Sequence, residues 1–366
     1  MKKTFWLNIG LQTAAVLLAL LVTTLILLLA GAPPLQAYAS ILRGAFGSTG
    51  DIADILISWS PLLLTTAGLL LTFTAGLWNI GIEGQITLGA IFTTGALRLL
   101  QDSSLPPALV ILLGILAGIL GGALWASLAG ALKVFGGVNE IFGGLGLNFV
   151  ATALTIWLIF GPWKRPGTGS MSGTLPFPES LWLSTFCPEG QASGAGGLCQ
   201  AFGSRFSPWP LLLGLLAIAV VFFLLRGTHF GLRLKAVGKN PRAAFLLGVP
   251  TWQYSMFAFA LCGIFAGLAG ALQVTAVYHR LIPSISSGYG FLGLLVAMLV
   301  NYQALWAAPV AFFFAALNIG GIQLPIALKL DSSLSGVLQG LLVLSVMMVD
   351  GARQRLLARK ETAAHG

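Results

Sequence analysis

Long apolar runs alternate along the chain with short polar or glycine-rich breaks, a pattern that predicts transmembrane helices. A helix that crosses a bilayer needs about 20 mainly apolar residues, and about ten segments approach that length. The predicted spans are roughly 8–30, 52–75, 80–100, 106–128, 139–160, 208–225, 252–276, 288–303, 305–322 and 334–349. Only the polar step Asn301–Gln303 separates the eighth from the ninth. An even number of spans places both termini on the same side of the membrane.

Composition excludes a soluble domain. Apolar residues make up 57% of the 366 and charged residues 8%, whereas soluble domains carry about 25% charge. The mean hydropathy is +0.93. We therefore expect an all-α integral membrane protein, with residues 1–350 forming one transmembrane domain. Glycine occurs 47 times and suits close helix packing in lipid; Gly114, Gly118 and Gly122 are predicted to form one packing face and Gly263 with Gly267 another.

The net charge is +9. The Lys and Arg residues gather mainly in the loops on one side of the membrane, as expected for residues that set topology, so we do not expect a nucleic-acid partner. Counted over the predicted loops, twelve of the 19 Lys and Arg residues fall on the side of the termini. Because cytoplasmic loops carry the excess of positive charge, we predict N-in and C-in, with 351–366 as a basic cytoplasmic tail. The apolar run after Lys2 and Lys3 is longer than the core of a signal peptide, which favours an uncleaved first span.

No catalytic or metal-binding motif occurs in the sequence. The phosphate-binding pattern G-x-x-x-x-G-K-[ST] is absent, as are HExxH and CxxC, and the three histidines are scattered. We therefore expect a conduit or scaffold that is not an enzyme by itself.

The outer loop 161–207 is rich in Gly, Pro and Ser, and we expect it to be solvated. Its Cys187 and Cys199 can form a disulfide in an oxidising compartment, a pairing that the sequence leaves open.

The basic loop 226–250 carries the start and stop signals of a short helix. Asn240 is a good N-cap and Pro241 suits the first helical position, while Gly248 and Pro250 end the segment. We predict about two turns that present Ala243, Ala244 and Leu247 together. Small residues on an exposed face can enter a shallow groove on a partner. The alternative is a loop whose basic residues only set topology, and the capping at both ends favours the docked helix.

Polar residues inside the spans form two groups. A lone carboxylate at the bilayer centre costs about 2.5–3.5 kcal/mol, so such groups normally face a cavity or a partner. Glu83 and Glu140 each follow an asparagine closely, and two roles stay open for these Asn–Glu pairs: hydrogen bonding across helices, or a place in a substrate path or gate. For Asn148 alone we favour hydrogen bonding. The candidate path residues are Asn79, Glu83, Gln85, Asn139, Glu140 and Asn148.

Five blocks of sequence together resemble a known family. They are "AGLWNIGIEGQITLGA", "GGVNEIFGGLGLNFVA", "GLRLKAVGKNPRAAFLLGV", "GIFAGLAGALQV" and "SGYGFLGLLVAML", in this order. The chain from about 35 to 350 resembles the inner-membrane permease subunits of bacterial ABC importers of the ribose and nucleoside branch. The first two blocks are most similar to nucleoside permeases that work with a lipoprotein receptor of the basic-membrane-protein class. The Gly/Ser-rich part of the outer loop and the stretch "LGLNF" depart from the family pattern.

The resemblance implies partners and roles. ATP and Mg²⁺ would bind a separate ATPase subunit, with no cofactor on this chain; a second, different permease and a lipoprotein receptor would complete the importer in the bacterial cytoplasmic (inner) membrane. The loop 226–250 would be the coupling loop that docks on the ATPase. The coupling residues implied by the match are Gly231, Arg233, Gly238, Asn240, Pro241, Arg242, Ala243, Ala244, Leu247 and Gly248.

Transport by alternating access is the mechanism that follows, and the weakly polar spans favour an uncharged solute that bears hydroxyl or amide groups. A nucleoside is the expected substrate, with a simple sugar as the main alternative. A proton-coupled secondary transporter using Glu83 or Glu140 is a further alternative, against which the capped cytoplasmic helix speaks. A membrane-embedded enzyme would need a catalytic cluster that the dispersed His and Cys residues do not provide.

Overall fold

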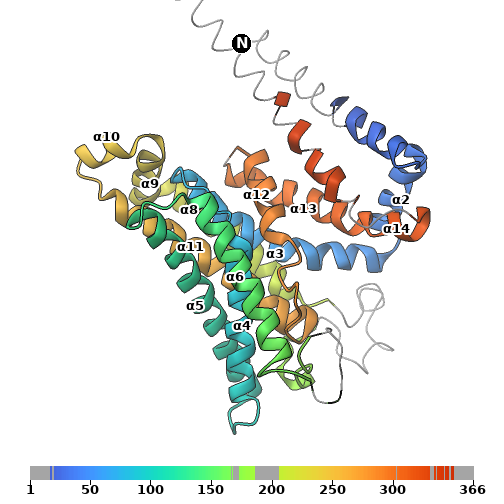
Figure 1. Ribbon diagram of the computed structural model, residues 1–366, viewed down its shortest axis with the longest axis horizontal. Helices are drawn as coiled ribbons and strands as arrows, with labels where there is room; N and C mark the ends of the chain where they lie inside the picture. The colour runs from blue at the N-terminus through green and yellow to red at the C-terminus, as the bar shows by residue number, and fades with distance from the viewer. Residues whose placement is uncertain are drawn as a thin grey trace, which may run out of the picture. The chain divides into compact units, whose positions relative to one another are not determined.

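The part of the chain that the structure describes contains helices and no strands. The computed structural model describes residues 17–18, 20–165, 167, 173–185, 206–301, 303–329, 334, 336–341, 343–345 and 348–349. Every regular element among them is a helix (Figure 1), which confirms the predicted all-α class. The chain divides into two compact units, Met1–Ile55 with Phe313–Gly366, and Leu56–Phe312. The prediction of a single transmembrane domain over 1–350 stays a prediction.

The helices follow one another with short connections. They are α2 (Pro34–Phe46), α3 (Thr49–Thr74), α4 (Ile82–Leu100), α5 (Pro107–Val134), α6 (Glu140–Phe160), the 3₁₀ turn η1 (Glu179–Leu181), α8 (Pro208–Gly227), α9 (His229–Lys239), α10 (Pro241–Leu246), α11 (Thr251–Leu272), the π-helical turn η3 (Gln273–Tyr278), α12 (Tyr289–Leu299), α13 (Ala304–Gly321) and α14 (Gln323–Leu328).

Six helices among the described residues are long and apolar enough to cross a membrane. They are α3, α5, α6, α8, the continuous segment Thr251–Tyr278 and the segment Ala304–Leu328. A bent pair, Leu20–Leu29 with Pro34–Phe46, raises the number to seven if it counts as one span. These six coincide with six of the predicted spans, so the chain is a multi-pass membrane protein.

Two predicted spans differ from the helices found. The segment 80–100 does form a helix, α4, but it is less apolar than the six. Because α5, α6 and α11 pack around α4, most of its side chains are buried and need not suit lipid. The prediction of a span over 288–303 is wrong in length: α12 has 11 residues and rises only about 16 Å, half the apolar thickness of a bilayer.

The ends of the chain are only partly described. Of the predicted span 8–30, the residues before 17 lie outside the described residues, and so do several residues of 334–349. Helix Leu20–Leu29 bends by 110° into α2, an element that the sequence analysis did not anticipate. Gly31, at φ +73°, and the prolines that open α2 account for the break. Within this unit the Tyr38 hydroxyl lies 2.7 Å from Thr23 Oγ1.

Glycines allow the closest helix contacts in the unit Leu56–Phe312. A Cβ added to Gly122 on α5 would lie 2.5 Å from the Gly267 Cα on α11, and one added to Gly89 on α4 would lie 2.5 Å from the same atom. Three helices therefore meet backbone to backbone at Gly267. This confirms the predicted packing faces, since Gly118 and Gly263 also contact the facing helix through their backbone.

We expect Gly122→Ala to destabilise the protein by about 1–3 kcal/mol, because the added methyl group must push α5 away from α11. The measurement is thermal unfolding of the purified protein in detergent. The matched control is Gly146→Ala on α6, where an added Cβ meets nothing within 4 Å; there alanine should be neutral or slightly stabilising. Equal midpoints for the two variants would contradict the proposed packing.

The described part of the loop 161–207 is not a solvated loop. Residues 173–185 form hydrogen bonds along the end of η3, with Phe177 N donating to His279 O (2.8 Å) and Leu183 N donating to Thr275 O (2.9 Å). Phe177 and Leu181 are buried in the core, and the Trp182 ring stacks on the His279 imidazole at 3.8 Å. The expectation of a solvated loop is therefore wrong for 173–185: two apolar side chains dock this segment.

Acidification is expected to loosen this segment. Partial burial lowers the pKa of His279 below its ordinary value of 6.5, so the docked state favours the neutral ring. The stability contributed by the neutral ring is complete above pH 6.5 and is lost as the pH falls toward the folded-state pKa, because the released state binds the proton more readily. The protection of the amides of 173–185 from hydrogen exchange, calculated relative to the intrinsic exchange rate at each pH, should therefore fall between pH 7 and pH 5. His279→Gln should abolish that dependence; an unchanged profile would show that another group controls it.

Candidate functional site

Two buried amides face each other where the chain enters α4. Asn79 and Gln85 are 1% and 0% exposed, and they exchange two hydrogen bonds: Asn79 Nδ2 donates to Gln85 Oε1 (3.1 Å) and Gln85 Nε2 donates to Asn79 Oδ1 (2.9 Å). Asn79 Nδ2 also donates to Cys262 Sγ on α11 at 3.1 Å. Both amides thus find partners inside the protein, as buried polar groups must.

Glu83 is the second residue of α4 and bonds the start of α12. Its Oε1 accepts a hydrogen bond from Phe291 N at 2.9 Å, and the carboxyl group also interacts with the Gly290 amide and the Ser286 side chain. The first amides of a helix have no partner within the helix and carry a partial positive charge. A carboxylate at this point satisfies them, so Glu83, itself only 6% exposed, joins α4 to α12.

Asn148 bonds α6 to the same entry segment. Its Oδ1 accepts from Gly84 N (2.8 Å) and its Nδ2 donates to Ile80 O (2.9 Å). Two glycines let the backbones approach this closely, since a Cβ on Gly144 would lie 2.6 Å from Gly81 N. These contacts agree with the hydrogen-bonding role favoured for Asn148 from sequence.

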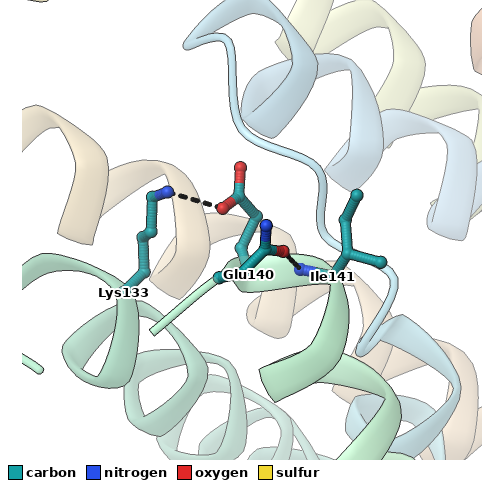
Figure 2. Close-up of polar contacts among 4 residues, drawn as sticks. Lys133, Glu140 and Ile141 are labelled. Carbon is teal, nitrogen blue, oxygen red and sulfur yellow. Dashed lines mark hydrogen bonds and ion pairs between the residues drawn. The ribbon is translucent and has the colours of Figure 1, made fainter. Parts of the chain in front are cut away.

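The second polar group lies where α5 turns into α6 (Figure 2). Asn139 Oδ1 accepts from Ile141 N at 2.9 Å and so caps α6. Glu140 Oε2 lies 2.6 Å from Lys133 Nζ, and the Glu140 carboxyl also interacts with the Trp78 backbone amide. The sequence analysis missed Lys133 as a partner, although the two residues flank one tight turn. The described geometry thus brings 78–85 together with Glu140 and Asn148 around α6.

The predicted coupling helix forms with its predicted N-cap. Asn240 Oδ1 accepts from Ala243 N at 3.0 Å, Pro241 is the first residue of α10, and Gly248 has φ +80°. The helix has six residues with Leu247 as its C-cap, which is close to the two turns expected. The left-handed Gly248 follows directly, so the helix also ends where the sequence predicted.

Exposure divides the α10 residues differently from the prediction. Ala244 is 2% exposed and points into the protein, so it does not share the free face expected for it. Arg242 and Ala243 are exposed. The sequence analysis missed Phe245 and Leu246, which with Leu247 are 65%, 84% and 83% exposed. Three adjacent large apolar residues in an otherwise basic loop are a pattern from which a docking surface could have been predicted.

The other predicted coupling residues hold α9 in place. Arg233 Nη1 donates to the Tyr254 hydroxyl of α11 at 3.2 Å. A Cβ on Gly238 would lie 3.0 Å from Gly76 N at the end of α3, and one on Gly231 would lie 2.7 Å from Leu225 Cα on α8. The glycines therefore let α9 approach both helices closely. Figure 1 shows α9 and α10 together at one end of α8 and α11.

The remaining sequence predictions concern metals and a disulfide. In the described ranges no three His, Cys, Asp or Glu side chains cluster as metal ligands. Cys187 and Cys199 lie outside the described residues, and their pairing stays a prediction. Cys262 is a free, buried thiol.

Comparison with known proteins identifies the family. Residues 51–347 match the family described as branched-chain amino acid transport system / permease component. A glucose ABC transporter permease protein of Haloferax volcanii is 30% identical over 93% of this chain and 87% of its own length. A guanosine ABC transporter permease protein of Bacillus subtilis is 25% identical over 91% of each chain. A nucleoside ABC transporter permease protein of Lactococcus lactis is 28% identical over 77% of this chain and 86% of its own. The chain belongs to this permease family, and it is the membrane-spanning permease subunit of an ABC transporter.

Proposed function

We propose that this chain is one of two different permease subunits in an importer that uses ATP to move a nucleoside into the cell. The observation that carries the proposal is the family match over 51–347, joined to an exposed apolar helix, α10, at one end of the unit Leu56–Phe312. Relatives named as guanosine and nucleoside permeases support the choice of solute.

In this proposal α10 is the part of the chain that touches the ATPase. Arg242, Ala243 and Leu247 make the contact together with Phe245 and Leu246, because these side chains are free. The remaining coupling residues support the helix: Asn240, Pro241 and Gly248 define its ends, and Gly231, Arg233, Gly238 and Ala244 fix it against α3, α8 and α11. A displacement of α10 by the ATPase would therefore also move α3, α8 and α11.

The translocation path is proposed to run beside the polar group of α4 and α6. Asn79, Gln85 and Asn148 have internal partners, and Glu83 and Glu140 are bonded as well. We infer that these residues, with the cap Asn139, set the positions of the helices that border the path. Solute would then meet hydroxyl and backbone groups with low affinity, which suits delivery from a receptor.

Ten spans with both termini in the cytoplasm remain our proposal for the topology, in the bacterial cytoplasmic membrane. The positive-inside distribution supports it. A lipoprotein receptor would deliver solute on the outer side, and ATP with Mg²⁺ would act on the separate ATPase. In a chain whose Cys187, Cys199 and Cys262 are replaced by serine, a cysteine introduced at Ala364 should then be labelled by an impermeant maleimide only after the membrane is opened; labelling in intact cells would reverse the topology.

The function is tested by uptake into vesicles that contain this chain together with the proposed ATPase, receptor and second permease. Labelled guanosine should enter only with ATP, and excess unlabelled nucleoside should compete while glucose does not. Competition by glucose alone would favour the sugar alternative, which the Haloferax relative supports. Uptake driven by a pH gradient without ATP would contradict the importer and favour proton coupling through Glu83 or Glu140.

A further inference from the structure

An open pocket lies between α9 and the ends of the long helices in the unit Leu56–Phe312. Its volume is about 930 Å³, within the range of small-molecule sites. One wall is a single face of α9, with Leu232, Lys235, Ala236 and Lys239 at helical spacing. The opposite walls come from the last turns of α3 and α8 and from the connection between α12 and α13.

Three cations line this pocket, and none of the acidic residues that the structure describes does. Arg226, Lys235 and Lys239 are in the lining, and the ion pair found among the described residues joins Lys133 to Glu140 instead. Lys235 Nζ donates to Leu225 O at 2.7 Å, which fixes the ammonium group in the wall and leaves two further N–H donors. The Arg226 guanidinium lies 5.5 Å from the Phe222 ring centre.

Helix ends alone explain only part of this arrangement. Arg226 and Lys239 lie in the last turns of α8 and α9, where cations stabilise the carbonyl end of a helix. Lys235 lies within α9, and its side chain reaches across to the Leu225 carbonyl in the last turn of α8. That bond to a helix end uses one of its three N–H donors, and the other two are not explained by it. Three positive groups from two helices line one concave surface. This arrangement favours an anionic ligand.

The rest of the lining indicates an amphiphilic anion. Phe222, Leu232 and Leu305 are apolar lining residues, and Asn301 and Gln303 line the pocket together with the cations. The pocket adjoins the ends of α3 and α8, two helices apolar enough to cross a membrane. Acyl chains can therefore lie along the apolar wall while a phosphate meets the cations, a combination found in lipid-binding pockets at membrane surfaces.

We propose that this pocket binds the phosphate-bearing headgroup of an anionic phospholipid, held by Arg226, Lys235 and Lys239. The bound lipid links α9, which carries the coupling helix, to α8 and to the connection between α12 and α13. It would therefore stabilise the position of α9 whichever solute the transporter carries.

The test measures lipid binding by the full chain, purified in detergent, using native mass spectrometry with added phosphatidylglycerol or phosphatidylcholine. The wild-type protein should retain phosphatidylglycerol in preference to phosphatidylcholine. Since each basic residue near an anionic surface contributes about fivefold in affinity, Arg226→Gln with Lys235→Gln and Lys239→Gln should weaken phosphatidylglycerol binding about a hundredfold. The matched control removes the same charge elsewhere: Lys164→Gln with Arg165→Gln and Arg280→Gln should bind like the wild type.

Several outcomes overturn the proposal. Equal binding by the triple variant and the wild type would do so, as would an equal loss in the control. Displacement of the lipid by equimolar inorganic phosphate would identify a free anion as the ligand. A triple variant that keeps the lipid but loses the ATPase would identify an acidic protein surface as the occupant.

If the triple variant does not fold, the single variant Lys239→Gln takes its place. The Lys239 side chain is exposed, and its replacement should still lower the affinity for phosphatidylglycerol about fivefold. None of these measurements depends on uptake, so they stand apart from the proposed function.

Discussion

Replacing Arg242 by Glu together with Ala243 by Trp is expected to abolish ATP-dependent uptake. Both side chains are exposed on α10, so under the proposed coupling role a reversed charge and a bulky ring would lie in the contact with the ATPase. Arginine and large apolar residues dominate interface energies, and two disrupted contacts of about 1.5–2 kcal/mol each weaken association about a hundredfold or more. The measurement is co-purification of the ATPase, followed by uptake in vesicles.

The fold of the variant chain should survive. The Asn240 cap uses the Ala243 backbone amide, which the substitution retains, and the buried Ala244 is untouched. The matched control, Lys164→Glu with Ser103→Trp, changes charge and bulk equally in exposed segments that follow α6 and α4, and it should transport normally. Normal uptake by the Arg242 and Ala243 variant at a normal protein level would show that α10 is not the coupling helix.

Replacing Glu83 by Ala is expected to cost about 2–4 kcal/mol of folding free energy, the second large effect. The change removes the acceptor for Phe291 N and leaves buried amides at the start of α12 unsatisfied, each at about 1–3 kcal/mol. Thermal unfolding and the amount of protein in the membrane would both fall. Uptake should fall in proportion to the protein level.

Glu83→Gln separates structure from transport. Its side-chain oxygen can still accept the bond from Phe291 N, so we expect a smaller loss of about 1 kcal/mol, since bonds to charged groups are the stronger ones. Uptake per molecule should then stay close to that of the wild type. The exposed Glu179→Gln serves as the control. A Glu83→Gln protein present at its normal level but unable to transport would show that the carboxylate itself acts in the solute or proton path.

Local features of this protein were predictable from sequence because neighbouring residues produce them. Apolar length predicted six helices that match the structure in place, and the cap at Asn240, the proline after it and the stop at Gly248 predicted α10. The glycine spacing predicted a packing face on α5 and another on α11, although it did not show that the two faces meet each other. Each of these depends on residues that are close in sequence, from about two helical turns for the cap and the glycines to about 20 residues for a span.

Long-range features were decided only by the tertiary structure. The sequence placed a carboxylate at Glu83 but could not show that it bonds an amide 208 positions away, and this bond helps to explain why α12 begins where it does. The burial of Ala244, the docking of 173–185 and the screening of α4 from lipid likewise depend on which helices surround them. A residue's preference for an apolar or polar setting is local, but the partner that satisfies it is chosen by packing, which is why the sequence could raise the question of Glu83 and only the fold supplied its contacts.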